Sequence, residues 1–143
     1  MTARCFAFAL AAALTLAVPA TAQEYAELAG GFGPSTYDVT VYAGGDIDAS
    51  SIGARCVGMV GETPQMTLSF TGYGGPLIIS AFSEADTSLA VQAPDGLWYC
   101  NDDTNGLNPR VNWNSADTGT YRIHVGAVGA SAQGVPLVLS IEE

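Results

Sequence analysis

The side chains best suited to chemistry lie in the segment NDDTNG, residues 101–106. Asn101, Asp103 and Asn105 place oxygen-bearing side chains at alternating positions, and a glycine follows them. This spacing is typical of calcium-binding loops, because calcium prefers carboxylate and carbonyl oxygens arranged around a sharp turn. A helix-flanked calcium loop is excluded, since the first position is asparagine and the twelfth is Asn112 instead of glutamate. The segment therefore predicts a looser calcium site that takes further ligands from elsewhere in the fold.

Two adjacent carboxylates favour a bound cation in the same segment. Asp102 and Asp103 repel each other unless a cation or solvent screens their charges. The residues predicted to bind calcium are Asn101, Asp102, Asp103, Asn105, Asn108 and Asp86. The alternative is an ordinary exposed turn, because asparagine, aspartate and glycine are also the residues that turns prefer. The sequence alone leaves both interpretations open.

Aromatic side chains form the second group that could contact a ligand, because surface tyrosine and tryptophan stack on sugars or grip protein partners. Strand alternation places Trp98 with Cys100 on one face and Tyr99 on the other. We expect Trp98 and Trp113 to be core residues. The aromatic residues predicted to be exposed and available to a ligand are Tyr73 and Tyr99.

The sequence offers few residues for catalysis. His124 is the only histidine, and alternation with Ile123 and Val125 places it on the outward face of its strand. Neither a G-x-S-x-G elbow nor an H-E-x-x-H motif occurs. We therefore predict that the protein is not an enzyme.

The chain begins with the layout of a secretory signal peptide. Arg4 precedes an apolar stretch over residues 5–18, and Ala-Thr-Ala at 20–22 forms an A-x-A cleavage site. The apolar stretch is shorter than the ~20 residues that a membrane-spanning helix needs. We expect removal of residues 1–22 and a periplasmic or secreted mature chain that does not insert into a membrane.

Two cysteines remain after this cleavage. Cys56 and Cys100 lie 44 positions apart, and two cysteines in an oxidising compartment usually pair. They are too few for a structural zinc site, and no histidine is near either of them in the sequence. We predict a structural disulfide between Cys56 and Cys100.

The charge of the chain excludes one class of partner. There is no lysine, and loss of Arg4 leaves three arginines against 14 acidic residues, a net charge of −11. The basic surface that binds nucleic acid or anionic lipid is therefore absent. Strong acidity favours solubility, and a cation-binding surface is the alternative interpretation.

The fold class follows from short alternating runs separated by glycine, proline, aspartate and asparagine. The predicted strands are 36–43, 65–71, 76–82, 88–93, 97–100, 110–114, 120–128 and 135–141. Their number and spacing predict an all-β fold, a two-sheet antiparallel β-sandwich or jelly roll of about eight strands. The domain organisation is then a signal peptide at 1–22, a flexible lead-in at 23–35, where glycines and a proline disfavour regular structure, and a single β-sandwich domain at 36–143.

Two segments, DTSLAVQAPDGLWYCNDD and TGTYRIHVGAV, carry a resemblance to a known family. The features that match are Asp86 at a strand start, the turn Pro94-Asp95-Gly96, the pair Asp102-Asp103, and Gly119, Tyr121, Ile123 and Val125 at alternating positions. The chain resembles bacterial pre-peptidase C-terminal (PPC) domains over about residues 36–142, and these are related to clostridial collagen-binding β-sandwich domains. The resemblance implies a place beside a secreted hydrolase and, as in some members, binding of calcium or of extracellular protein fibres.

These observations predict an exported, non-catalytic β-sandwich binding or accessory module, stabilised by calcium, that acts on or beside a secreted protein or polymer. One alternative is a small secreted hydrolase or its remnant, with His124 or the pair Asp102-Asp103 in a concave site. Another is a protein like a protease inhibitor, which would present a rigid exposed loop such as TGYGGPL, residues 71–77. Inside the sandwich, Tyr121 is expected to pack in the core with its hydroxyl tied near the start of its strand.

Overall fold

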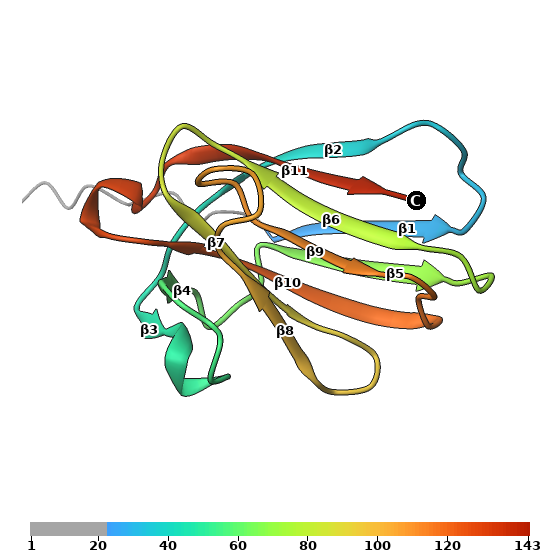
Figure 1. The fold of residues 1–143 in the computed structure, drawn as a ribbon, viewed down its shortest axis with the longest axis horizontal. Coiled ribbons are helices and arrows are strands. Elements are labelled where there is room, and N and C mark those ends of the chain that lie inside the picture. Colours follow the sequence, from blue (N-terminus) through green and yellow to red (C-terminus); the bar gives the residue numbers. More distant parts are fainter. Residues whose placement is uncertain (1–22) are drawn as a thin grey trace, which may run out of the picture.

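The computed structural model describes residues 23–143, so the predicted signal peptide at 1–22 lies outside the described residues. Two β-sheets pack face to face in this part of the chain (Figure 1). Sheet A contains β1 (Glu24–Ala29), β3 (Ile47–Asp48), β4 (Met59–Val60), β5 (Met66–Thr71), β7 (Thr87–Gln92), β8 (Trp98–Asn101) and β10 (Gly119–Ala127). Sheet B contains β2 (Tyr37–Tyr42), β6 (Leu77–Phe82), β9 (Arg110–Trp113) and β11 (Pro136–Glu142). Two short 3₁₀ turns, η1 (Ala49–Ser51) and η2 (Ala130–Ala132), complete the structure, and none of the described residues forms a helix long and apolar enough to span a membrane.

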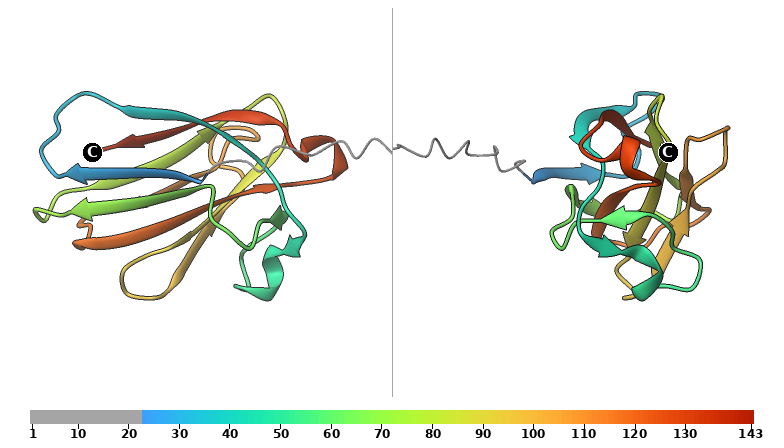
Figure 2. Two further views of the ribbon diagram at one scale, coloured as in Figure 1. Left: turned by 180° about the vertical axis from the view of Figure 1, so that it is seen from behind. Right: turned by 90° about the vertical axis from the view of Figure 1, so that its left-hand side faces the viewer.

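The predicted β-sandwich is confirmed. Each of the eight expected strands is present, with its ends within one residue of the prediction. Sheet B has the order β2-β11-β6-β9 and is antiparallel throughout. Sheet A runs β1-β5-β10-β7-β8, and β4 and β3 extend it from the end of β10 (Figure 2).

The segment 23–35 differs from the prediction of a flexible lead-in, which is wrong for its first half. Glu24–Ala29 forms β1, which pairs in parallel with β5 at the edge of sheet A. The reason is that every glycine of this segment follows Ala29, so the preceding residues are free to extend and to bury Ala26 against the core. The turn after β1 is held to the C-terminal residue, because the backbone N–H groups of Gly31 and Gly33 donate hydrogen bonds to the Glu143 carboxylate.

The core between the sheets is built by strand alternation, as the sequence predicts. Its largest fully buried side chains are Tyr121, Phe70, Met66, Leu68, Leu77, Ile79, Leu89, Ile123, Leu139 and Ile141. Tyr121 packs edge-on against Phe70, and its hydroxyl donates to the Asp117 carbonyl over 2.9 Å, which confirms the expected tie at the strand start. Burial raises the pKa of Tyr121 to about 12, so the hydroxyl remains a donor.

A second, smaller core lies on the outer side of sheet A. Residues 45–64, which we call the flap, fold over this outer face and carry β3, η1 and β4 (Figure 1). The predicted disulfide between Cys56 and Cys100 is present and joins the flap to β8. Ala49 and Val60 are buried beside it. The flap therefore covers the outer face of sheet A where β7, β8 and β10 lie, whereas Tyr25 on the outer face of β1 stays 59 % exposed.

Small residues on this outer face let the flap approach the sheet. Ala90 and Gly126 face the flap, and a Cβ atom on Gly126 would lie only 2.2 Å from Ser88 Oγ and 3.2 Å from a Val60 methyl group. Ser88 Oγ donates over 2.7 Å to the carbonyl of Val57 in the flap. Close packing and this hydrogen bond hold the flap against the sheet together with the disulfide.

Candidate functional site

The predicted calcium loop connects β8 in sheet A to β9 in sheet B across one end of the sandwich. Asn101 Oδ1 accepts hydrogen bonds from the Thr104 hydroxyl over 2.7 Å and from the Arg110 backbone N–H over 2.9 Å. Asn105 and Asn108 form an isolated backbone bridge around a glycine with a φ of 62°. The loop is thus organised by its own hydrogen bonds, and Asn101 is the residue that organises it.

The other predicted ligands lie close to this loop. Asn108 Oδ1 accepts from the Ser83 N–H over 2.9 Å and ties the loop to the β6–β7 connection. The pKa of Asp86 is raised, first by burial and then by the charges of Asp103 and Asp102. Asp86 is therefore within electrostatic reach of the acidic pair. Within residues 23–143, however, no three His, Cys, Asp or Glu side chains are close enough together to hold a metal ion.

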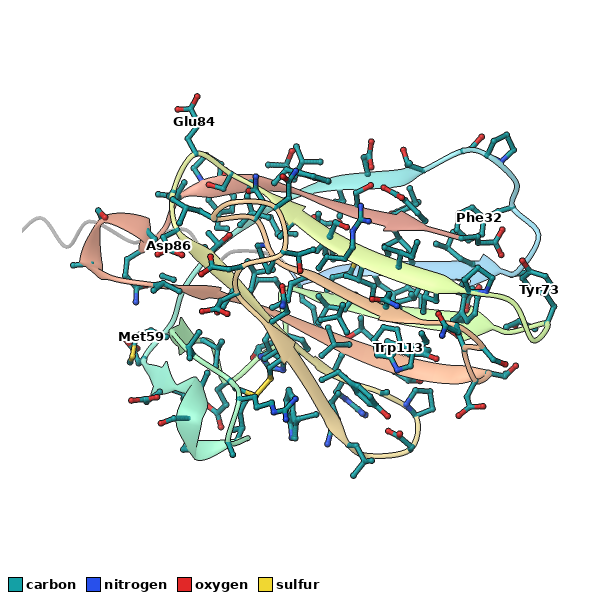
Figure 3. All side chains as sticks on the ribbon, viewed as in Figure 1. Phe32, Met59, Tyr73, Glu84, Asp86 and Trp113 are labelled. Atoms are coloured by element: carbon teal, nitrogen blue, oxygen red, sulfur yellow. A yellow bond between two sulfur atoms is a disulfide. The ribbon has the colours of Figure 1, made fainter. Side chains whose placement is uncertain are left out.

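The first aromatic candidate, Tyr73, is exposed as predicted, with 59 % of its surface accessible. Its loop is held rigidly, because the Gly72 N–H donates to Thr118 Oγ1 and the Ala116 N–H donates to the Gly75 carbonyl, both over 2.9 Å. The ring lies against the backbone of Gly75 and that of Gly30, where a Cβ atom would collide with it. Figure 3 shows Tyr73 and Asp86 at opposite ends of the sandwich, so the two predicted sites are separate.

The second aromatic candidate, Tyr99, is half-buried, and the prediction that it is exposed is wrong. Its ring packs edge-on against Trp113 at 5.1 Å, and its hydroxyl donates to Asp95 Oδ2 over 2.7 Å, which raises its pKa. The reason is that β8 lies in sheet A with Tyr99 facing the main core and Trp98 facing the flap. Of the two tryptophans predicted to be core residues, Trp113 is half-buried and packs on Tyr121 against the main core, and Trp98 is half-buried against the smaller core under the flap.

His124 faces outward from sheet A, as alternation predicts, but the flap buries it. The ring is 6 % exposed, Nδ1 lies 3.0 Å from the Gly61 carbonyl, and Trp98 packs against it at 5.4 Å. Burial and the charge of Arg122 lower the pKa of His124, while the Gly61 carbonyl opposes that shift. Among residues 23–143 its hydrogen-bond partner is a backbone carbonyl, so no Ser-His-Asp triad is assembled around it.

The outer face of sheet B carries an apolar surface that the sequence prediction missed. We call it the open face. Its exposed side chains are Tyr42 (46 %), Phe82 (40 %), Val138 (41 %) and Pro136. Val138 lies between Phe82 and Thr40 in the strand register, and Pro136 lies opposite Tyr42. A shallow hollow of about 650 Å³ lies beside Phe82 and Val138. The sequence feature that could have predicted the open face is the presence of Tyr42 and Val138, which are large apolar residues at positions where alternation expects polar ones.

Acidic residues surround the open face. Asp38 and Glu142 project from its strands, and Glu84 lines the hollow. Figure 3 shows Glu84 projecting away from the body of the sandwich. Arg110 is the one arginine on this side of the described structure, and its Nε donates to Ser80 Oγ over 3.0 Å. The open face is therefore apolar in its middle and mainly acidic at its edges.

The comparisons with known proteins find similarity in fold only. No protein-family profile and no curated protein sequence matches the chain. The pre-peptidase C-terminal domain of a collagenase from Bacillus anthracis is 14 % identical, with a TM-score of 0.47 over 85 % of this chain and 97 % of that one. PliG of Aeromonas hydrophila, a periplasmic lysozyme inhibitor of g-type lysozyme, is 14 % identical, with a TM-score of 0.44 over 85 % of this chain and 98 % of that one. The first is a domain of the type that the sequence resembles.

Proposed function

We propose that this protein is an extracytoplasmic, non-catalytic β-sandwich module that binds a protein partner through its open face. The observation that supports this proposal is the exposure of Phe82 and Val138 opposite each other on neighbouring strands, with Tyr42 beside Pro136 one outward position further along β11. Soluble proteins rarely leave such apolar groups together on the surface unless a partner covers them. The Cys56–Cys100 disulfide supports the extracytoplasmic location, because disulfides persist in oxidising compartments.

The acidic edges of the open face indicate the kind of partner. Asp38, Glu84 and Glu142 would lie around the contact, and residues 23–143 carry three arginines against 14 acidic residues. A partner with basic residues around an apolar contact would complement this surface and would bind faster at low salt. We therefore propose a basic extracytoplasmic protein as the partner.

The experiment that tests the proposal is capture of proteins from the extracytoplasmic fraction of the source cells. The immobilised wild-type protein is compared with the double variant Phe82→Ser/Val138→Ser and with Leu97→Ser, a matched control whose side chain is 61 % exposed on the β7–β8 turn. Loss of a central apolar contact costs a protein interface about 2 kcal/mol or more. The partner is expected to bind the control as well as the wild type and the double variant at least tenfold more weakly. Equal binding to all three proteins would contradict docking on the open face.

A second candidate function uses the Tyr73 loop. The rigid seating of this exposed ring is the property that a protein resembling an inhibitor needs, because a fixed aromatic side chain loses little entropy on binding. The same capture experiment includes Tyr73→Ser. A partner that binds every protein except Tyr73→Ser would assign binding to the Tyr73 loop. A partner that binds every protein except the double variant would assign binding to the open face.

Calcium binding at the acidic loop stays a prediction from the sequence. The residues do not form a ready-made metal site, because Asn101 and Asn108 already accept hydrogen bonds and leave mainly the carboxylates of Asp86, Asp102 and Asp103. Excess calcium is expected to raise the melting temperature slightly by screening these three charges, and Asp103→Asn should remove the rise. Magnesium at equal ionic strength is the control. A large calcium-specific rise would show that the loop rearranges into a chelating site.

A further inference from the structure

A crevice of about 320 Å³ lies between the flap and the outer face of sheet A. Ile47, Ile52 and Val60 line its flap side, and Trp98, Arg122 and His124 line its sheet side. We call it the His124 crevice. Its size is at the small end of ligand pockets, and it combines apolar walls with a few polar groups, which is the composition of sites for small ligands.

The first polar group is the Nε2 atom of His124. A carbonyl oxygen only accepts hydrogen bonds, so the contact of Nδ1 with the Gly61 carbonyl requires the proton to be on Nδ1 in the neutral ring. Nε2 is then an acceptor. Nε2 has no hydrogen-bond partner among residues 23–143. It is not fully buried, because the one fully buried side-chain polar atom without a partner in this range is Thr87 Oγ1. Since His124 lines the crevice, Nε2 is accessible from it. A ligand must offer it an O–H or N–H donor.

The second polar group is the guanidinium of Arg122, two residues earlier on the same face of β10. It lines the crevice and makes no ion pair or side-chain hydrogen bond with any other residue of the described chain. Glu62 also lines the crevice but is not within ion-pair distance. This exposed guanidinium, which no acidic side chain of residues 23–143 pairs with, is free to bind an anion, and its planar shape matches a carboxylate in particular.

The third feature is the half-buried indole of Trp98, which forms one wall of the crevice. His124 packs against it at 5.4 Å with the planes inclined by 58°, and Cys100, two residues along β8, carries the disulfide to the flap. These contacts fix the orientation of the indole. A fixed indole at the edge of a polar crevice is suited to the apolar face of a sugar ring or of another flat ring.

We propose that the His124 crevice binds an acidic sugar of the uronic-acid type. The carboxylate pairs with Arg122, a ring hydroxyl donates to His124 Nε2, and the apolar face of the ring lies on Trp98. A neutral sugar leaves the arginine without a counterion, and a fatty acid leaves the imidazole acceptor without a donor. This binding is independent of docking on the open face, because the crevice lies on the other side of the sandwich.

The test follows the ring signals of His124 by NMR while D-glucuronate is added to the exported, oxidised protein. His124 is the only histidine of the chain, so its ring resonances are unambiguous. A ligand of this size is expected to bind with a dissociation constant of about 1 mM. D-glucose, which lacks the carboxylate, is expected to bind at least about tenfold more weakly, because it cannot form the charge-assisted hydrogen bonds.

Matched arginine variants separate the site from general charge effects. Arg122→Gln is expected to weaken D-glucuronate binding about tenfold, whereas Arg110→Gln on sheet B is expected to leave it unchanged. Near-ultraviolet circular dichroism confirms that both variants keep the native fold, and both arginines are exposed on strands. Tryptophan fluorescence gives a second readout, because Trp98 lies in the crevice and Trp113 in the core.

Three outcomes would overturn the proposal. One is the absence of a saturable change up to about 50 mM D-glucuronate, fifty times the expected dissociation constant. Another is an equal response to sodium acetate, which would show an effect of any carboxylate without recognition of a sugar. The third is unchanged binding by Arg122→Gln in a variant that keeps its native spectrum.

Discussion

The two outer faces of this sandwich are built from strands of the same kind, yet the flap covers part of one, whereas no segment of residues 23–143 covers the other. On sheet A the outward residues near the flap are small, with Ala90 and Gly126 in neighbouring positions of the register. On sheet B the outward positions carry Tyr42, Phe82 and Val138. Small side chains let a segment of the same chain pack against the first face, whereas large apolar ones leave the second face with a surface that a partner can bury.

The difference shows which face of the sandwich can form a site for a small molecule and which can bind a macromolecule. The covered face gains a crevice, because the flap meets the sheet beside larger side chains such as Trp98 and Arg122 and cannot close over them. No segment of residues 23–143 lies above the open face, which has a shallow hollow beside Phe82. A crevice suits a small molecule and a flat apolar face suits a macromolecule.

The largest expected effect comes from releasing the flap. Replacing both cysteines, Cys56→Ala and Cys100→Ala, should lower the free energy of unfolding by ~4 kcal/mol, because the bridge closes a loop between residues 44 apart. Urea unfolding of the variant and of the reduced wild type measures the loss. A loss below ~1 kcal/mol in both would show that packing alone holds the flap, and the covered face would then not depend on the disulfide.

A smaller effect is expected from placing a large side chain under the flap. Gly126→Val should destabilise the protein by ~1–3 kcal/mol, because the new side chain collides with Ser88 and Val60. Valine at an exposed position of the open face, in Thr40→Val, should alter stability by less than ~0.5 kcal/mol, since Thr40 is exposed. Thermal unfolding of the two variants provides the measurement. Equal losses would break the distinction between a covered and an open face.

The smallest expected effect is the pH dependence that His124 contributes. Its pKa is lowered in the folded state from the ordinary value of 6.5, so below that value the unfolded chain binds more protons than the folded one. Its contribution to stability is complete above about pH 7 and is lost as the pH falls through the lowered folded value. Urea unfolding between about pH 8 and pH 5 should show this loss in the wild type and not in His124→Gln. An unchanged pH profile in the variant would mean that His124 is not shielded by the flap.

The sequence correctly predicts that Tyr121 is a core residue with its hydroxyl bonded near the start of its strand, that Cys56 pairs with Cys100, and that Tyr73 is exposed. It fails for Tyr99 and for the first half of the segment 23–35, where β1 forms. The failure at Tyr99 has a physical reason: alternation sorts side chains onto two faces without showing which face meets the main core. The failure at 23–35 arises because composition was averaged over a segment whose glycines lie only in its second half.

The acidic loop, residues 101–106, is a further case in which the sequence pattern does not decide the role of a side chain. Its asparagines and aspartates are placed by the sequence, but the hydrogen bonds of Asn101 and Asn108 depend on Arg110 and Ser83, which the fold brings to them. A side-chain oxygen that organises a loop and one that binds a cation have the same residue type and spacing. Only the neighbouring donors distinguish the two roles.

The sequence by itself determined the eight main strands, the inward residues of the core, the pairing of Cys56 with Cys100, and the excess of acidic charge. These properties depend on alternation, turn chemistry and composition, which are local. The tertiary structure alone decided that the flap covers part of sheet A, that His124 is buried beside Trp98, and that no segment of residues 23–143 covers sheet B. Those features depend on contacts between residues far apart in the chain and on the sizes of the side chains that meet there, which local patterns do not contain.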